Sequence, residues 1–275
     1  MSEHPRVVIV TGSGGSGCGR AIAVRFAADR AAVVVSDINE VGGHETVRLI
    51  EERGGLAAFC RADVTDELQV RQLIEFAEST FGGLSVLVNN ASSPHPAAEG
   101  IAGWTPSLQT DLLGTIYATG YAIETMRRFG GGSIVNISSI SALWHGRKTP
   151  GGFPGYDVAK LGVIRLTTVV AKDVANDGIR VNCLAPGWIA TDGPRQYWES
   201  LTPAQRAERG VPSKLLSTED IAEMVVRLAT DRSLNGRIVV WWSEDLPRLI
   251  EWGDRGYRDV AEIPPSPERT PLTIR

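Results

Sequence analysis

Short runs of apolar, often β-branched residues recur along the chain, and segments of helical character separate them. The first run, Val7 to Val10, is apolar at every position, which suits a strand covered on both faces of a parallel sheet. The sequence predicts further strands at 32–36, 57–60, 85–88, 133–137, 179–184 and 237–241. It predicts helices at 21–28, 42–53, 67–80, 103–128, 156–176 and 221–229, the last one capped by Thr218. This alternation predicts an α/β fold, a doubly wound parallel sheet with helices on both faces.

Two later regions depart from this alternation. Residues 192–213 are polar and charged and contain prolines, so we interpret them as a mobile lid. From Glu244 onward, charges and then prolines dominate, which predicts an extended or partly ordered tail. We therefore expect one domain over residues 1–243, including the lid, and a C-terminal extension over 244–275.

Composition excludes several classes of protein. Hydrophobic residues make up 43% and charged residues 22%, which is ordinary for a soluble globular protein. A net charge of −4 predicts neither a nucleic-acid partner nor an anionic membrane surface. We expect no membrane span, because no apolar run approaches the required ~18 residues, and no signal peptide is visible. Cys18, Cys60 and Cys183 fit neither a disulfide framework nor a metal-ligand spacing, so we expect no metal and a cytoplasmic location.

A glycine-rich loop, T-G-S-G-G-S-G-C-G-R, follows the first strand and leads into a helix. Glycines let the backbone approach a pyrophosphate, and the helix N-terminus supplies free N–H groups and a favourable dipole. The candidate phosphate-binding residues are Gly12, Ser16, Gly17 and Gly19. The alternative is a plain flexible turn.

Asp37 ends the second predicted strand and lies 18 residues after Gly19. This spacing is close to that of an acidic residue that accepts hydrogen bonds from the ribose hydroxyls of a dinucleotide. A carboxylate there repels a 2′-phosphate, and the next residue, Ile38, offers no compensating cation. We therefore predict NAD as the cofactor, with NADP less favoured. The alternative is that Asp37 caps the next helix.

Polar clusters follow other strands. Asn89-Asn90-Ala91 comes directly after the strand at 85–88, at the edge where open α/β sheets bind ligands. A hydrogen-bonded turn is the alternative interpretation. Ser138-Ser139 follows the strand at 133–137 in the same way.

Tyr156 and Lys160 are four positions apart at the start of a predicted helix, so both can face the same point. A cation close to a phenol favours the phenolate and lowers the pKa of the tyrosine. The hydroxyl of Ser139 can then hold a substrate oxygen while Tyr156 gives or takes its proton. By itself, a Tyr-x-x-x-Lys pair also fits an ordinary surface helix.

Together these motifs resemble the short-chain dehydrogenase/reductase family in its single-domain, Rossmann-type branch. The resemblance covers roughly Arg6 to Val240. It rests on Thr11-Gly12, Asp37, Asp63-Val64, Asn89-Asn90-Ala91, Ser139, Tyr156-x-x-x-Lys160, and Asn182 through Pro186-Gly187 to Thr191.

The resemblance implies reversible hydride transfer between NAD and a secondary alcohol or ketone. Tyr156 would be the general acid/base, Lys160 would bind the nicotinamide ribose and lower the pKa of the tyrosine, and Ser139 would orient the substrate oxygen. Further cofactor contacts would come from Gly12, Ser16, Gly17, Gly19, Asp37, Ile38, Asp63, Val64, Asn89, Ala91, Tyr156, Lys160, Pro186, Gly187, Ile189 and Thr191. A homo-oligomer, tetramer or dimer, would form through the helices at 103–128 and 156–176.

Four departures from the family pattern stand out. The glycine loop is one residue longer than usual, and Asp111 occupies the position of the family's catalytic Asn, so we count it as a candidate catalytic residue. Its charge is expected to raise the pKa of Lys160. Ser139 and Tyr156 are 17 residues apart, which places extra residues at 144–155 beside the expected substrate site. Trp242-Ser243-Glu244 replaces the usual Asp-Gly-Gly after the last strand.

These departures leave two functional hypotheses. The first is an active NAD-dependent dehydrogenase with an unusual pocket, because the Ser, Tyr and Lys are all present. The second is a dinucleotide-binding regulatory or scaffold protein that has lost efficient catalysis. The extra segment carries Trp144, His145, Arg147 and Lys148, which fit either an anionic or aromatic substrate or a solvated loop. Trp188, Trp198, Trp241 and Trp242 fit an apolar pocket or core and subunit packing equally well.

Overall fold

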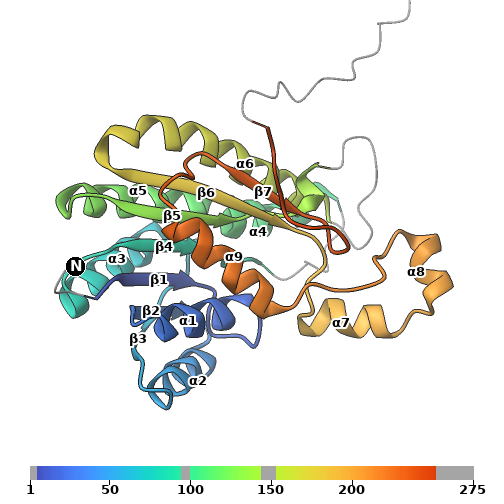
Figure 1. The fold of residues 1–275 in the computed structure, drawn as a ribbon, viewed down its shortest axis with the longest axis horizontal. Coiled ribbons are helices and arrows are strands. Elements are labelled where there is room, and N and C mark those ends of the chain that lie inside the picture. Colours follow the sequence, from blue (N-terminus) through green and yellow to red (C-terminus); the bar gives the residue numbers. More distant parts are fainter. Residues whose placement is uncertain (1–4, 94–99, 144–152, 252–275) are drawn as a thin grey trace, which may run out of the picture.

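The computed structural model describes residues 5–93, 100–143 and 153–251, and the described strands form one sheet (Figure 1). The strand order is β3-β2-β1-β4-β5-β6-β7-β8. Neighbouring strands from β3 to β7 pair in parallel, and β8 pairs antiparallel to β7. The strands are β1 Val7–Thr11, β2 Ala32–Asp37, β3 Leu56–Arg61, β4 Val86–Asn89, β5 Gly132–Ile137, β6 Ile179–Pro186, β7 Ile238–Trp241 and β8 Arg248–Leu249. The predicted doubly wound α/β fold is thereby confirmed.

Helices cover both faces of the sheet (Figure 1). The α-helices are α1 Cys18–Ala28, α2 Glu40–Glu51, α3 Glu67–Phe81, α4 Thr105–Ser107, α5 Gly114–Arg128, α6 Pro154–Asp173, α7 Asp192–Glu199, α8 Pro203–Arg209 and α9 Thr218–Thr230. Short 3₁₀ segments occur at Ile101–Trp104, Ile140–Leu143 and Ala175–Asp177. Helices α1, α2 and α9 pack on one face, and α3, α5 and α6 pack on the other.

The two cores explain why the strands are apolar at every position. Val8 and Val10 of β1 point into the core beneath α1 and α9, whereas Val7 and Ile9 point into the core beneath α3 and α5. Successive side chains of a strand point to opposite faces, so a strand covered on both faces buries all of them. Burying each such side chain stabilises the fold by about 1.5–3 kcal/mol.

Three local predictions need correction. The cap of α9 is Ser217, not Thr218, because the Ser217 hydroxyl accepts from the Asp220 N–H at 3.0 Å in a capping box. The predicted helix at 103–128 is interrupted by a π-helix at Leu108–Leu113. The C-terminal segment contributes a further strand, Arg248–Leu249, which the sequence did not predict.

The lid region also has more regular structure than its composition indicated. Residues 192–213 contain α7 and α8, which project beyond the end of the sheet (Figure 1). Thr202 and Gln205 form a capping box at the start of α8. Residues 144–152 of the predicted extra segment (144–155) and the tail beyond Glu251 lie outside the described residues.

Candidate active site

The glycine loop joins β1 to α1 and packs tightly against itself. Gly12 has a positive φ of 66° that favours glycine, and a Cβ on Gly19 would lie 2.1 Å from the Gly12 carbonyl oxygen. A Cβ on Gly14 would lie 2.8 Å from Asp37. These contacts assign packing roles to three of the glycines.

The N-terminus of α1 is the part of this loop that suits an anion. Within the described residues, no side chain caps α1 and its first turn carries no acidic residue. Asn39, Asp66 and Ser217, by contrast, cap α2, α3 and α9. The free N–H groups of α1 and its dipole therefore fit the pyrophosphate of a dinucleotide.

Asn90 holds the glycine loop against the end of β4. Its side-chain amide donates to the carbonyl oxygens of Thr11 at 2.9 Å and Gly12 at 3.0 Å. The Thr11 hydroxyl in turn accepts from the N–H groups of Asn90 and Ala91, both at 3.1 Å. Asn90 belongs to the predicted Asn89-Asn90-Ala91 motif, in which its position alone indicated no separate role. In the structure it links the two strand ends beside the predicted cofactor site.

Asp37 lies at the end of β2 against the glycine loop. One carboxylate oxygen accepts from the Gly14 N–H at 2.7 Å and the other from the Asn39 N–H at 2.9 Å. The cap of α2 is Asn39, which accepts from Gly42, so the alternative that Asp37 caps this helix is wrong. The next side chain, Ile38, is 59% exposed.

Three other predicted cofactor residues lie close to the same edge of the sheet. Asp63 accepts from the backbone and hydroxyl of Thr65 at 2.9 and 2.7 Å. Val64 is buried, and a Cβ on Gly114 would lie 2.9 Å from it. Asn89 is buried, and its amide donates to Asn136 at 2.8 Å and to Thr119 at 3.2 Å. The Asn89 amide group thus faces the interior.

The last residue of β6 and the segment after it contain the four predicted contacts to the nicotinamide, at Pro186, Gly187, Ile189 and Thr191. The backbone of this segment is fixed by Ser243, whose hydroxyl accepts from the Trp188 N–H at 2.7 Å. A Cβ on Gly187 would lie 2.6 Å from that hydroxyl, which explains the glycine. Ser243 belongs to the unusual segment after β7, and no sequence signal pointed to this role.

The glycine loop and the start of the lid meet at this point. The Ser16 hydroxyl donates to the Asp192 carboxylate at 2.9 Å. A Cβ on Gly17 would lie 3.4 Å from the Thr191 methyl group. The structure therefore places the glycine loop beside Thr191 and Asp192.

Ser139, Tyr156 and Lys160 also converge. A hydrogen bond joins Tyr156 to Ser139, and the Lys160 ammonium lies 5.3 Å from the centre of the Tyr156 ring. Lys160 is fixed by its side-chain N–H donation to the Ile137 carbonyl at 3.0 Å. Ser138 donates to the Lys160 carbonyl at 2.7 Å, which ties the first turns of α6 to the end of β5.

Asp111 completes this cluster from the π-helix. Its carboxylate lies 3.0 Å from the Lys160 ammonium, and the two side chains are 0% and 3% exposed. It also accepts from the hydroxyls of Ser92 at 2.5 Å and Ser93 at 3.1 Å. π-Helical turns often occur at functional sites. Here the π-helix places the buried carboxylate of Asp111 next to Lys160, the lysine predicted to act with Tyr156.

The buried charges shift the pKa values of both catalytic candidates. Burial lowers the pKa of Lys160, but Asp111 and Tyr156 together raise it above its usual value. Burial raises the pKa of Tyr156, Lys160 lowers it, and Asp111 raises it again, with a net increase. Lys160 thus lowers the pKa of Tyr156 as expected, but burial and the Asp111 charge raise that pKa by more.

A cavity of about 660 Å³ lies against the lid and reaches the residue that follows Ser139. Ile140 and Trp188 line it, and they directly follow Ser139 and Gly187 in the chain. Its other walls come from α8, the residues after it and the segment after β7, namely Pro203, Arg206, Ala207, Gly210, Val211, Pro212, Ser213, Trp242, Ser243, Glu244 and Asp245. The size is that of a small-molecule pocket.

In the described part of the chain, no group of three or more His, Cys, Asp or Glu side chains is arranged to hold a metal ion. Among the same residues, no helix combines the length and apolar character needed to cross a membrane.

The fold and these residues are those of a Rossmann-type α/β protein, and comparisons with known proteins identify the family. Residues 13–240 match a family model described as enoyl-(acyl carrier protein) reductase. The chain is 36% identical over 230 residues to cis-4-hydroxycyclohexanecarboxylate dehydrogenase of Sinomonas cyclohexanicum, covering 82% of this chain and 90% of the relative. It is 33% identical over 230 residues to cyclohexanol dehydrogenase of Acinetobacter sp. strain SE19, covering 82% and 88%.

A solved structure agrees with these relatives. It is 7α-hydroxysteroid dehydrogenase complexed with NADH and 7-oxo glycochenodeoxycholic acid, with a TM-score of 0.75 and 29% identity. The similarity covers 87% of this chain and 93% of that structure. The chain belongs to the short-chain dehydrogenase/reductase family, whose enzymes use a nicotinamide dinucleotide to oxidise alcohols or reduce carbonyl groups. The family predicted from the sequence is confirmed.

Proposed function

We propose that the protein interconverts a cyclic secondary alcohol and its ketone with NAD as the cofactor. The observation that carries the proposal is the cluster of Ser139, Tyr156 and Lys160 next to the cavity. Two relatives are named for the oxidation of cyclohexane-ring alcohols, and the structural neighbour is named for a hydroxysteroid. The apolar walls formed by Ile140, Trp188 and Trp242 suit such a ring.

Each residue of the cluster has a separate role in this proposal. The Ser139 hydroxyl holds the substrate oxygen, and Tyr156 removes its proton during oxidation or supplies it during reduction. Lys160 stabilises the phenolate, and the neighbouring Asp111 raises the pKa of the lysine ammonium. A bound nicotinamide dinucleotide supplies the hydride acceptor or donor. Asp111 acts through Lys160 and is therefore a positioning residue.

The dinucleotide would lie along the carboxyl ends of the strands. Gly12, Ser16, Gly17 and Gly19, with the N-terminus of α1, would hold its pyrophosphate. The other contacts carried over from the family are those of Ile38, Asp63, Val64, Asn89, Ala91, Pro186, Gly187, Ile189 and Thr191. Lys160 and Tyr156 would contact the nicotinamide ribose.

We propose NAD rather than NADP because of Asp37. Each of its carboxylate oxygens accepts one backbone N–H and retains a lone pair for a ribose hydroxyl. A 2′-phosphate would place two negative groups together beside the exposed Ile38. Titration of the protein with NADH and NADPH, followed by cofactor fluorescence, should give tighter NADH binding. Asp37→Asn should reduce the preference by about tenfold or more, and equal affinities in the wild type would contradict the assignment.

The substrate class is tested by following NADH formation with cyclohexanol and with 2-hexanol, an open-chain alcohol with the same number of carbons. The proposal predicts higher kcat/KM for the ring alcohol. Tight NADH binding without turnover on a broad panel of alcohols and ketones would instead support the regulatory or scaffold hypothesis.

We also propose a homo-oligomer, because apolar side chains are exposed on α5, α6 and the π-helix before α5. Ile116 of α5 and Val158, Leu161 and Val169 of α6 are all exposed, as is Leu113 of the π-helix. A contiguous exposed apolar surface marks an interaction site. Light scattering should show a dimer or tetramer in the wild type and smaller species for Leu161→Glu. Val41→Glu, at a still more exposed apolar position on α2, is the control, and a wild-type monomer would overturn the proposal.

We propose a reducing, cytoplasmic location as well. The observation that supports it is that Cys18, Cys60 and Cys183 are all free thiols.

A further inference from the structure

Arg206 is held in a fixed orientation at the wall of the cavity. Its guanidinium lies 3.3 Å from the centre of the Trp198 ring, and its Nε donates to the Trp198 carbonyl at 3.0 Å. The Trp198 ring is itself fixed, because its indole N–H donates to the Pro212 carbonyl at 2.8 Å. Stacking on an aromatic face and one backbone hydrogen bond thus orient the guanidinium before any ligand binds.

The terminal nitrogens of Arg206 have no acceptor in the described part of the chain. No carboxylate there lies within 4.0 Å of its guanidinium, and its only hydrogen bond is made through Nε. The two other arginines of the lid are occupied differently, since Arg195 donates to the Ala190 carbonyl and Arg209 to the Tyr197 hydroxyl. Among the described residues that line the cavity, Arg206 is the only cation.

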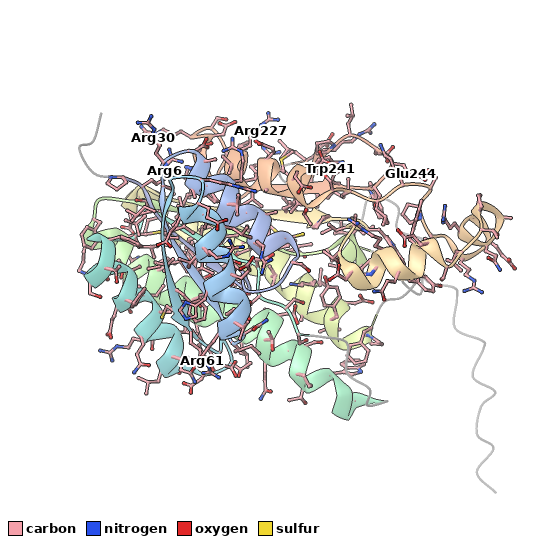
Figure 2. The ribbon with its side chains drawn as sticks, turned by 90° about the horizontal axis from the view of Figure 1, so that it is seen from below. Arg6, Arg30, Arg61, Arg227, Trp241 and Glu244 are labelled. Carbon is pink, nitrogen blue, oxygen red and sulfur yellow. The ribbon has the colours of Figure 1, made fainter. Side chains whose placement is uncertain are left out.

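Two carboxylates also line the cavity, and they must be compared with Arg206. Figure 2 shows Glu244 at the end of the molecule that carries the lid. Its carboxylate accepts from the Ser213 N–H at 2.5 Å, a contact that lowers its pKa. Glu244 and Asp245 are exposed, whereas Arg206 is partly buried against Trp198. Water and salt screen the exposed charges more than the stacked guanidinium.

We infer that Arg206 binds a carboxylate carried by the substrate, at a position away from the reacting hydroxyl. The planar guanidinium presents its two terminal nitrogens as a fork that matches a carboxylate, and a charge-assisted pair of this kind is stronger than a neutral hydrogen bond. The apolar walls take the ring while Arg206 takes the acid. The substrate class is therefore a ring alcohol that bears a carboxylate. This inference rests on the proposed function.

A matched series of cyclohexanols tests it, with a carboxylate, a carboxamide or an aminomethyl group at the 4-position. Wild-type kcat/KM with NAD should favour the carboxylate over the carboxamide by about 10- to 100-fold, mainly through KM. Arg206→Gln should remove most of this preference, and Arg206→Lys should retain part of it. Arg209→Gln is the matched control on the same helix and should leave the preference intact.

A second measurement is independent of turnover. Cyclohexanecarboxylate has no hydroxyl to oxidise, so it should bind the wild-type protein and should bind Arg206→Gln at least about tenfold more weakly. Equal rates for the carboxylate and the carboxamide, or a preference for the aminomethyl compound, would overturn the role of Arg206 and leave the proposed function standing. Failure to oxidise any ring alcohol, cyclohexanol included, would overturn both.

Discussion

The two sides of the cavity are built in opposite ways. The catalytic floor, defined as Ser139, Tyr156, Lys160 and Asp111, adjoins the cavity next to Ile140 and is attached to the end of β5, to α6 and to the π-helix. Lys160 and Asp111 are almost completely buried and form an ion pair. The outer wall, defined as Trp198, Arg206 and Glu244, lies on short helices and on the segment after β7. These residues are exposed or only partly buried.

This difference assigns proton transfer to the buried floor and selection of the substrate to the outer wall. Proton transfer needs groups held in a narrow range of positions, and buried hydrogen bonds from several elements supply that restraint on the floor. The outer wall touches few other elements, so it can change without disturbing the floor. We expect substitutions on the floor to change stability and rate together, and substitutions on the wall to change mainly the choice of substrate.

The largest effect on stability is expected from breaking the buried ion pair. Lys160→Met leaves the Asp111 carboxylate without its cation, and Asp111→Asn leaves the Lys160 ammonium without its anion. Either substitution should lower the free energy of unfolding by about 3–5 kcal/mol. The double variant should lose much less than the sum, because no charge is left unpaired. Urea denaturation measures the full cycle, and additive losses would show that the pair is not coupled.

Asp111→Asn should also shift the pH dependence of alcohol oxidation. Oxidation requires the phenolate of Tyr156, and the Asp111 charge raises the pKa of that phenol. Removing the charge favours the phenolate, so the rise of kcat with pH should move to lower pH. Glu199→Gln, on the exposed side of α7, is the control and should leave the profile in place. If kcat of Asp111→Asn rose only at higher pH than kcat of the wild type, the predicted direction would be wrong.

A smaller loss of stability is expected where Ser243, next to Glu244 of the outer wall, contacts the segment after β6. Ser243→Ala removes the acceptor for the Trp188 N–H and should lower the free energy of unfolding by about 1–2 kcal/mol. We also expect KM for the alcohol to rise, because Trp188 lines the cavity. Ser233→Ala, a change at an exposed turn, is the comparison. An unchanged KM with unchanged stability would show that Ser243 is dispensable.

The smallest change in stability is expected for Arg206→Gln on the outer wall. Its stacking on a partly exposed Trp198 is worth about 1 kcal/mol or less. Thermal or urea unfolding should therefore place this variant close to the wild type. If Arg206→Gln lowered the free energy of unfolding as much as Lys160→Met does, the floor and the outer wall would not differ in their contribution to stability.

The fold was predictable because its strands are covered on both faces. Runs such as Val7 to Val10 have no other stable place than between two helical layers. The π-helix was not predictable, and it places Asp111 in an ion pair with Lys160, a residue 49 positions away in the chain. Strand β8 has only two residues, both exposed, and therefore lacks the apolar pattern that identified the others.

The candidate site was predictable where a motif follows a strand, and less so elsewhere. Tyr156 and Lys160 lie close together as their spacing indicated, and Ser139 meets them from the residues that follow β5. The positioning roles of Asn90 and Ser243 depend on backbone groups from distant strands, which no local pattern encodes. The sequence Thr202 to Gln205 fits a capping box and could have predicted the start of α8, but the prolines of this region favoured an irregular segment instead.

The most direct test of the central claim uses Tyr156→Phe, measured for NADH binding and for ring-alcohol oxidation on the same preparation. The substitution removes one hydroxyl and keeps the ring over Lys160. We predict NADH binding close to that of the wild type and a loss of kcat of about 10²- to 10⁴-fold. Retained turnover would show that Tyr156 is not the acid/base.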